Sequence, residues 1–436
     1  MLATHRRLHP LPLLAGALLT LAATIPADAA GNPDPTFSGD GRATVQLPHG
    51  LGAVATAVAV AAHGSVLAAG TTTIGDDDLV VARLSSTGGL DTTFGSGGTA
   101  FVAFDLGGSN DDHLEEVALR ADGKIVLLGG ASTGTSQSLA VARLLANGQP
   151  DSFFGTGGKR VVGPPQWPTG VVYVRAAAVQ ADGKYLFAGS CRQCPAGSDQ
   201  NSNPFVARLL ANGTLDTSFG SGGWVVGPWV APFMPDQHDW VLHLAVDSSG
   251  RILAQVKSYD VSGSVQVVRL LASGALDASW SGDGVAVLVT DPVYEAQALG
   301  VDPASGAVYS AFGVFDTGVE IRRLLPNGTT DSNFAYFGTL NLADEVTVAD
   351  LLVDASGRLL VVGDAAEERF WLARILANGT PDNSWSFDGF NTVEFDLTAG
   401  GDDIGHAAAL SGTKLVTVGS AMTLLGREAF AILRTD

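Results

Sequence analysis

Residues 206–219 read VARLLANGTLDTSF, and this stretch decides the fold because its pattern recurs along the chain. An apolar run carrying Arg208 leads to Asn212-Gly213, then to Asp216 and, three residues later, to Phe219. Asn-Gly pairs favour tight hairpin turns, because both residues tolerate a positive φ. The stretch therefore predicts a strand, a turn and the approach to a second strand.

The Asp-x-x-aromatic part of this pattern occurs seven times. Successive Asp residues are 57, 60, 65, 61, 54 and 51 positions apart, so the unit is about 57 residues long. The seven pairs are Asp34/Phe37, Asp91/Phe94, Asp151/Phe154, Asp216/Phe219, Asp277/Trp280, Asp331/Phe334 and Asp382/Trp385. A fixed period of this size predicts a repeat architecture.

An arginine stands eight residues before six of these aspartates. The arginines are Arg83, Arg143, Arg208, Arg269, Arg323 and Arg374, and the aspartates are Asp91, Asp151, Asp216, Asp277, Asp331 and Asp382. Residues that recur in every unit are expected to be framework. The aspartate would accept backbone N–H groups in its turn or pair with the arginine, and the aromatic would fill the gap between units. A ligand site repeated in every unit is the alternative.

Each unit also contains a second pair of apolar runs around a turn. Val117 to Leu119 leads through Asp122-Gly123 into Ile125 to Leu127, which with the two strands above gives four strands per unit. Seven units of four antiparallel strands predict an all-β, seven-bladed β-propeller. The segment Asn32 to Leu47 has no inner strands of its own. It is expected to complete the last blade and so close the ring.

The units resemble the delta-60 repeat, a bacterial family with the pattern "DGKI…G…VARL…NG.LD..FG.GG". The copies around Gly123, Gly183 and Gly357 match this pattern well, and the resemblance covers nearly all of the chain after the N-terminal segment. It implies a propeller-like fold and export, and it implies no reaction. The fifth and sixth copies depart from the FGxGG ending, with Trp280 to Gly284 and Phe334 to Gly338 in its place.

The N-terminus has the features of a secretory signal peptide. Arg6 and Arg7 precede an apolar stretch from Leu11 to Ile25, and Ala27-Asp28-Ala29 fits a cleavage site. The apolar run is short for the alternative, a transmembrane anchor. We therefore expect a signal peptide at residues 1–29, one propeller domain at residues 30–436, no membrane insertion after cleavage, and export to the periplasm or the exterior.

The composition narrows the range of partners. The formal net charge is −20, which argues against nucleic acids and anionic membranes, because both require basic surfaces. The protein is expected to be a monomer whose partner is a small molecule, a glycan or another protein.

The two cysteines, Cys191 and Cys194, lie in a loop rich in Pro, Gly and Asn. A thioredoxin-like C-x-x-C motif would open a helix, and a single pair supplies at most half of a zinc site. A local disulfide in an oxidising compartment is therefore expected.

The irregular loops are the expected place for binding. The short DG-type and NG-type turns share one face, whereas longer connections gather on the opposite face, where function tends to lie. The candidate ligand-binding residues are Asp112, His113, Trp167, His238, Trp240 and Asp403, with His406 in the last connection. The alternative is that these loops are polar only because they meet water, and that their tryptophans pack beneath them.

Enzyme and cofactor signals are few. Gly130-Ala131-Ser132-Thr133-Gly134 fits G-x-S-x-G, but no helical pattern follows it as a nucleophile elbow requires. No cofactor is identified, although the clustered acidic residues are of the kind that calcium prefers as ligands. The leading hypothesis is a non-enzymatic exported binding or scaffold protein. The alternative is a hydrolase, lyase or metal-dependent lactonase with its site at the central opening.

Overall fold

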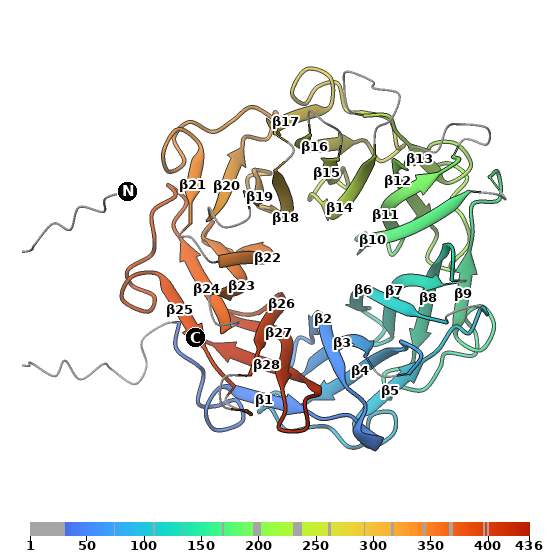
Figure 1. Ribbon diagram of the computed structural model, residues 1–436, viewed down its shortest axis with the longest axis vertical. Helices are drawn as coiled ribbons and strands as arrows, with labels where there is room; N and C mark the ends of the chain where they lie inside the picture. The colour runs from blue at the N-terminus through green and yellow to red at the C-terminus, as the bar shows by residue number, and fades with distance from the viewer. Residues whose placement is uncertain are drawn as a thin grey trace, which may run out of the picture.

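Seven small sheets stand in a ring around a central opening in the computed structural model (Figure 1). The structure describes residues 31–436 apart from 74, 108–109, 133, 168–169, 195–201, 230–237, 260–262, 292, 315–317, 343–345, 366–368, 396 and 399–400. The expected signal peptide lies outside these residues. No helix in the described part of the chain has the length and apolar character to span a membrane.

Every sheet has four strands. The first blade contains β2 (Ala53–Val60), β3 (Val66–Thr72), β4 (Leu79–Leu84) and β5 (Thr99–Val102). The second contains β6 (Asp112–Leu119), β7 (Ile125–Ser132), β8 (Gln137–Leu144) and β9 (Lys159–Val162). The third contains β10 (Val171–Val179), β11 (Tyr185–Arg192), β12 (Ser202–Leu209) and β13 (Trp224–Val226). The fourth contains β14 (Asp239–Val246), β15 (Ile252–Ser258), β16 (Ser264–Leu270) and β17 (Val285–Val289). The fifth contains β18 (Tyr294–Val301), β19 (Val308–Val314), β20 (Gly318–Leu324) and β21 (Thr339–Asn341). The sixth contains β22 (Val346–Val353), β23 (Leu359–Ala365), β24 (Arg369–Ile375) and β25 (Phe390–Val393). The last blade contains β26 (Asp403–Ser411), β27 (Lys414–Met422), β28 (Glu428–Thr435) and β1 (Arg42–Val45), and a short 3₁₀ helix, η1 (Pro48–Gly50), leads from β1 toward β2.

The strand order confirms the predicted fold. In each of the first six blades the strands pair in chain order, from the innermost strand at the opening to the strand after the Asp-x-x-aromatic motif at the rim. The irregular fifth and sixth copies also form full blades. Three of the seven copies have glycine after the aromatic, and in the fifth and sixth copies Ser281 and Ala335 adopt the same positive φ, at 56° and 47°.

The core lies mainly between blades. Each repeat aromatic is almost fully buried, and Phe219 of the third blade packs in a cluster with Val241, Ile252 and Val268 of the fourth. Burial of this kind is non-directional, and each blade therefore depends on its neighbour for much of its apolar contact.

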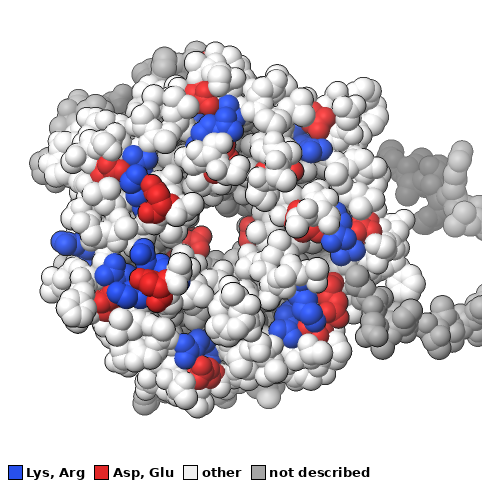
Figure 2. All heavy atoms as spheres, turned by 180° about the vertical axis from the view of Figure 1, so that it is seen from behind, with Lys and Arg blue, Asp and Glu red and all other residues white. Residues whose placement is uncertain are grey.

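An arginine-centred contact joins five of the blades to the next one among the described residues, because the arginine donates to a backbone carbonyl in the neighbouring turn. In the third blade, Arg208 donates through Nε to Asp216 Oδ2 at 2.9 Å and through Nη1 to the carbonyl of Ala272 at 2.5 Å. Ala272 belongs to the turn of the fourth blade, and Phe219 lies under the guanidinium, 4.4 Å from ring centre to Cζ. Figure 2 shows basic and acidic side chains in adjacent groups around the opening. The seven ion pairs are Arg83–Asp91, Arg143–Asp151, Arg208–Asp216, Arg269–Asp277, Arg323–Asp331, Arg374–Asp382 and Arg434–Asp34.

The same contact closes the ring, because its last copy joins the two ends of the chain. β1 pairs antiparallel with β28, from Arg42 opposite Leu433 to Val45 opposite Phe430. Asp34 accepts hydrogen bonds from Arg434 Nε and Lys414 Nζ, both at 2.6 Å. The predicted closure by the N-terminal strand is therefore confirmed.

Removing the carboxylate of Asp34 should weaken this closure. Burial alone would raise the pKa of Asp34, but hydrogen bonds from Lys414, Thr36 and Arg434 hold it well below its usual value. Asp34→Ala leaves the buried guanidinium of Arg434 without its partner, and we expect a loss of about 3 kcal/mol in unfolding free energy at pH 7. Denaturant unfolding measures this loss. It should shrink as the pH falls below about 3.9, because the wild-type carboxylate is then protonated in the unfolded state.

Asp40→Ala is the matched control in the same segment. The Asp40 carboxylate is exposed and accepts the N–H of Arg42 at 3.0 Å, so its removal should change stability by less than about 0.5 kcal/mol. Equal losses in both variants would show that the closure does not depend on the ion pair.

Candidate functional site

A β-bulge interrupts the innermost strand of every blade. The pairing register slips by one residue at the same place in each, for example between Val174 and Ala176 of β10. The seven extra residues are Thr56, Glu115, Arg175, Leu242, Gln297, Ala349 and His406. Bulges re-aim side chains and are common beside active sites. Here they occupy equivalent positions in the seven inner strands, and their side chains differ from blade to blade.

These strands enclose a central channel of about 260 Å³. Its ionisable lining residues come from five blades, and Figure 2 shows acidic side chains at the edge of the opening. They are Glu115 and Glu116 on β6, Arg175 on β10, His243 on β14, Asp350 on β22 and His406 on β26. The channel thus gathers groups that lie far apart in the sequence.

The channel walls desolvate the carboxyl groups. This raises the pKa of Glu115 to about 7, although the charge of Arg175 opposes the rise. It raises the pKa of Glu116 to about 8, with a further contribution from the negative charge of Asp350. The pKa of Asp350 itself rises to about 6, again through burial, while the N–H groups of Ala408 and Leu351 hold it down. Glu116 is therefore mostly protonated near neutral pH.

The two channel histidines are affected in the opposite direction. Burial lowers the pKa of His243 to about 4, and it also lowers the pKa of His406, against the charge of Asp364. Both rings are thus neutral near pH 7. Carboxyl groups that keep a proton at this pH can act as hydrogen-bond donors or general acids.

An aromatic cavity of about 490 Å³ opens beside the channel on the long-loop face. Trp240 stacks on Tyr173 with ring centres 5.7 Å apart and planes 25° apart, and the Arg175 guanidinium lies 5.3 Å from the Trp240 ring. Tyr259 is 46% exposed on the opposite wall. The lining residues are Arg175, Arg192, Ser202, His238, Trp240, Leu242 and Tyr259, and none of them is acidic.

A polar cavity of about 370 Å³ lies on the other side of Arg175. Its wall comes from the first two blades and includes Thr71 to Thr73, Asp77, His113 and Glu115. Arg175 lines this cavity, the aromatic cavity and the central channel. The three spaces therefore meet at one guanidinium.

The six candidate residues from the sequence lie in three different settings. His113, His238 and Trp240 line the cavities at the channel mouth. Asp112 and Asp403 are buried, and each accepts a backbone N–H at 2.7 Å, from Phe104 and Phe395. These two carboxylates hold the preceding connection against the inner strand and do not face a ligand space. Trp167 is half-buried and packs edge-on against Trp224, with ring centres 6.1 Å apart.

Apart from His406, the ionisable residues of the channel were not among the sequence candidates. His406 was expected in a connection, but it lies inside strand β26 because that strand begins at Asp403. No prediction from the sequence named Glu115, Glu116 or Asp350. Comparison of the aligned repeats would have singled them out, because the equivalent pair in the first blade is Thr56-Ala57.

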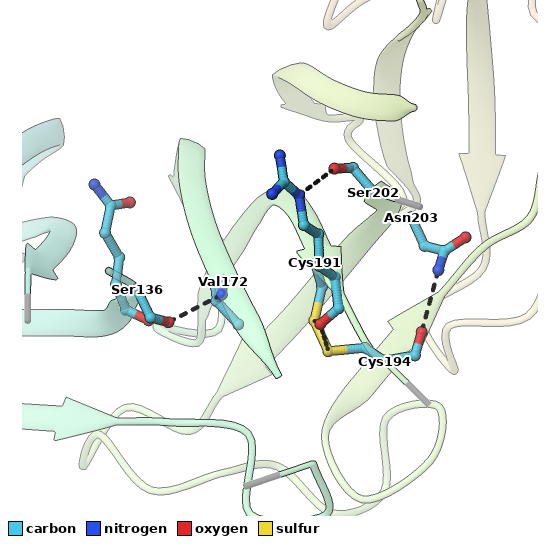
Figure 3. The surroundings of a disulfide bond; sticks show 8 residues. Ser136, Val172, Cys191, Cys194, Ser202 and Asn203 are labelled. Carbon is cyan, nitrogen blue, oxygen red and sulfur yellow. Dashed lines mark hydrogen bonds between the residues drawn. A yellow bond between two sulfur atoms is a disulfide. The ribbon is translucent and has the colours of Figure 1, made fainter. Parts of the chain in front are cut away.

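The structure joins Cys191 and Cys194 in a disulfide at the rim of the aromatic cavity (Figure 3). A hydrogen bond attaches the disulfide-bonded loop to strand β12 of the third blade, because Asn203 donates its side-chain amide N–H to the carbonyl of Cys194 at 3.3 Å. Between the cysteines, Arg192 donates through Nε to Ser202 Oγ, also at 3.3 Å. The disulfide therefore lies next to one of the two cationic groups of the cavity.

Within the residues that the structure describes, no three His, Cys, Asp or Glu side chains are placed to hold a metal ion together. The calcium expectation from the acidic loops stays a prediction.

Comparison with known sequences supports the repeat architecture. A family model described as "Domain of unknown function (DUF5122) beta-propeller" matches residues 64–94, 120–154, 180–219 and 355–384. These segments fall in four different blades, and each ends at or near a repeat aromatic. The chain thus carries repeats of a β-propeller family. No curated protein matches the sequence.

Solved structures are similar in fold at low identity. A polysaccharide lyase, Uly1, superposes with a TM-score of 0.53 at 11% identity and covers 90% of each chain. Regucalcin from Agrobacterium tumefaciens, described as a calcium-binding protein, gives a TM-score of 0.36 at 16% identity and covers 74% of this chain and 90% of its own. The first likeness supports the fold alone, and the second is too distant to add to it.

The raised pKa of Glu116 makes stability depend on pH. Between its ordinary value of 4.5 and its folded value of about 8, the folded state keeps a proton that the unfolded state releases. Stability therefore falls as the pH rises through this window. Glu116→Gln removes the titration, so we expect its melting temperature at pH 9 to exceed that of the wild type by about 2 °C or more. At pH 4, where the wild-type group is protonated in both states, the two should agree.

A Glu→Gln change at Glu428, which lies on β28 outside the channel, is the control for a general effect of charge. Its shift in melting temperature should be the same at pH 4 and pH 9. If Glu116→Gln behaves in the same way, the carboxyl of Glu116 is solvated and its titration is ordinary.

Proposed function

We propose that this protein is an exported binding propeller of the delta-60 type, which holds an acidic saccharide at the mouth of its central channel. The observation that carries the proposal is the aromatic cavity on the long-loop face. In a chain of net charge −20, the lining residues that the structure describes in this cavity include two arginines and a histidine and no carboxylate. Such a site would attract an anion that the rest of the surface repels.

The cavity has the groups that an acidic sugar requires. Trp240 and Tyr259 offer broad ring surfaces against which the apolar face of a sugar ring can pack. Arg175 and Arg192 offer guanidinium N–H groups, which bind carboxylates in a bidentate manner. The Nδ1 atom of His238 accepts the N–H of Ser202 at 3.2 Å, which leaves its Nε2 to carry a proton as a donor.

A second candidate function is catalysis in the central channel. The raised pKa values of Glu115 and Glu116 favour it, because a carboxyl that keeps its proton near neutral pH can serve as a general acid. A hydrolase, a lyase or a lactonase would need such a group within reach of the bound ligand. We favour binding over catalysis, because the cavity that fits a sugar ring lies at the mouth of the channel, whereas Glu115 and Glu116 line the channel itself.

Calorimetric titration with two matched sugars tests the proposal. Methyl β-glucuronide and methyl β-glucoside differ only in the carboxylate, so the protein should bind the first and not the second. Trp240→Ala should weaken binding at least about tenfold by removing the stacking surface, and Arg175→Gln should reduce the preference for the acid.

Tyr336→Ala is the control for loss of an exposed aromatic. Tyr336 is 74% exposed in the outer turn of the fifth blade, outside all three cavities, so this variant should bind like the wild type. Equal binding of the two glycosides, or of neither, would overturn the proposal. The appearance of new reducing ends in an acidic polysaccharide incubated with the protein would favour the catalytic alternative.

A further inference from the structure

We propose that the polar cavity beside Arg175 is a second subsite, which takes a neutral sugar ring joined to the acidic ring in the aromatic cavity. The inference rests on the proposed function and names its ligand more closely. The ligand would be a saccharide in which an acidic ring and a neutral ring are neighbours, with the acid group at Arg175.

The first step is the position of Arg175. As the bulge residue of β10 it lines both cavities at the mouth, with Trp240 of the fourth blade on one side and His113 of the second blade on the other. A group bound to this guanidinium therefore lies at the border between the two cavities. A ligand with its carboxylate there can extend into both.

The second step is the chemistry of the polar cavity. Three of its threonine hydroxyls are engaged by the framework: Thr56 donates to the carbonyl of Leu114, Thr71 accepts the N–H of Leu114, and Thr72 accepts the N–H of Asp78. The carboxylate of Asp77 and the ring of His113 have no hydrogen bond to protein groups among the described residues. An acceptor and a ring with a donor nitrogen suit the hydroxyl groups of a sugar.

The two cavities also differ in the charge of their lining residues. Asp77 and Glu115 line the polar cavity, and burial together with the charge of Asp111 raises the pKa of Asp77, against the influence of His113. At pH values where these two groups are ionised, a second carboxylate would meet their negative charges and be repelled. The aromatic cavity has no acidic lining residue. The two cavities thus differ in the ring that they accept, which is how a site discriminates between similar ligands.

Titration with sugars of one and two rings tests the subsite. The probes are methyl β-glucuronide, disaccharides of glucuronic acid with glucose in both linkage orders, and digalacturonic acid. One of the mixed disaccharides should bind at least about tenfold more tightly than the single-ring glucuronide, and digalacturonic acid should show no such gain. A mixed disaccharide without this gain overturns the subsite.

Two variants test whether the gain in affinity for the disaccharide comes from the polar cavity. His113→Ala and Asp77→Asn should each reduce the affinity for the disaccharide toward that of the glucuronide, and both should leave the affinity for the glucuronide unchanged. His113 is exposed, so the variant should fold, and its melting temperature checks this. A loss of affinity that is equal for both sugars would contradict a separate subsite while leaving the proposed function intact. Failure of every acidic sugar to bind would overturn both.

Discussion

The arginine that joins its own blade to the turn of the next is the contact on which the ring depends. A four-stranded sheet of this size has too little apolar surface to be stable alone, so each blade needs a fixed position against its neighbour. Apolar packing around Phe219 supplies attraction without direction. Arg208 supplies direction, because its planar guanidinium holds Asp216 with one edge and the carbonyl of Ala272 with another. The ion pair recurs in all seven blades and the bond to the next turn in five of them, so the same contact sets the step between those neighbouring blades.

This division of roles explains why the fold could be predicted from the sequence. The contact requires an arginine, an aspartate eight residues later and an aromatic three residues after that, so it leaves a pattern that survives irregular copies. Ser281 and Ala335 show how much irregularity is tolerated, since both adopt the positive φ that glycine adopts elsewhere. The strand order and the use of the N-terminal strand in the last blade followed from counting these repeats.

The candidate site followed from the sequence only in part. His113, His238 and Trp240 were candidates because the sequence suggests loops there, and they line the cavities, although His113 and Trp240 lie at the starts of β6 and β14. Asp112 and Asp403 looked the same in sequence but are buried and accept backbone N–H groups. The β-bulges prevented the sequence pattern from identifying most of the channel residues. An extra residue in a strand shifts the alternation of inward and outward side chains, so the orientation of Glu115, Arg175 or His406 cannot be read from a simple period of two. The bulge residues also differ from blade to blade, because the repeated Arg–Asp pairs lie elsewhere in each blade.

The pairing of β1 with β28 has a consequence for the order of events in folding. Asp34 and Arg434 are separated by 400 residues, so the ring can close only after nearly the whole chain has been made. Until then the earlier blades can stack in sequence, each on the one before, as an open arc with an unpaired strand at its growing end. Strand β1 can therefore join its blade only after β28 has been made. The slow, entropically costly step of bringing distant segments together is thus left to the end, when a rigid arc already holds the two ends near each other.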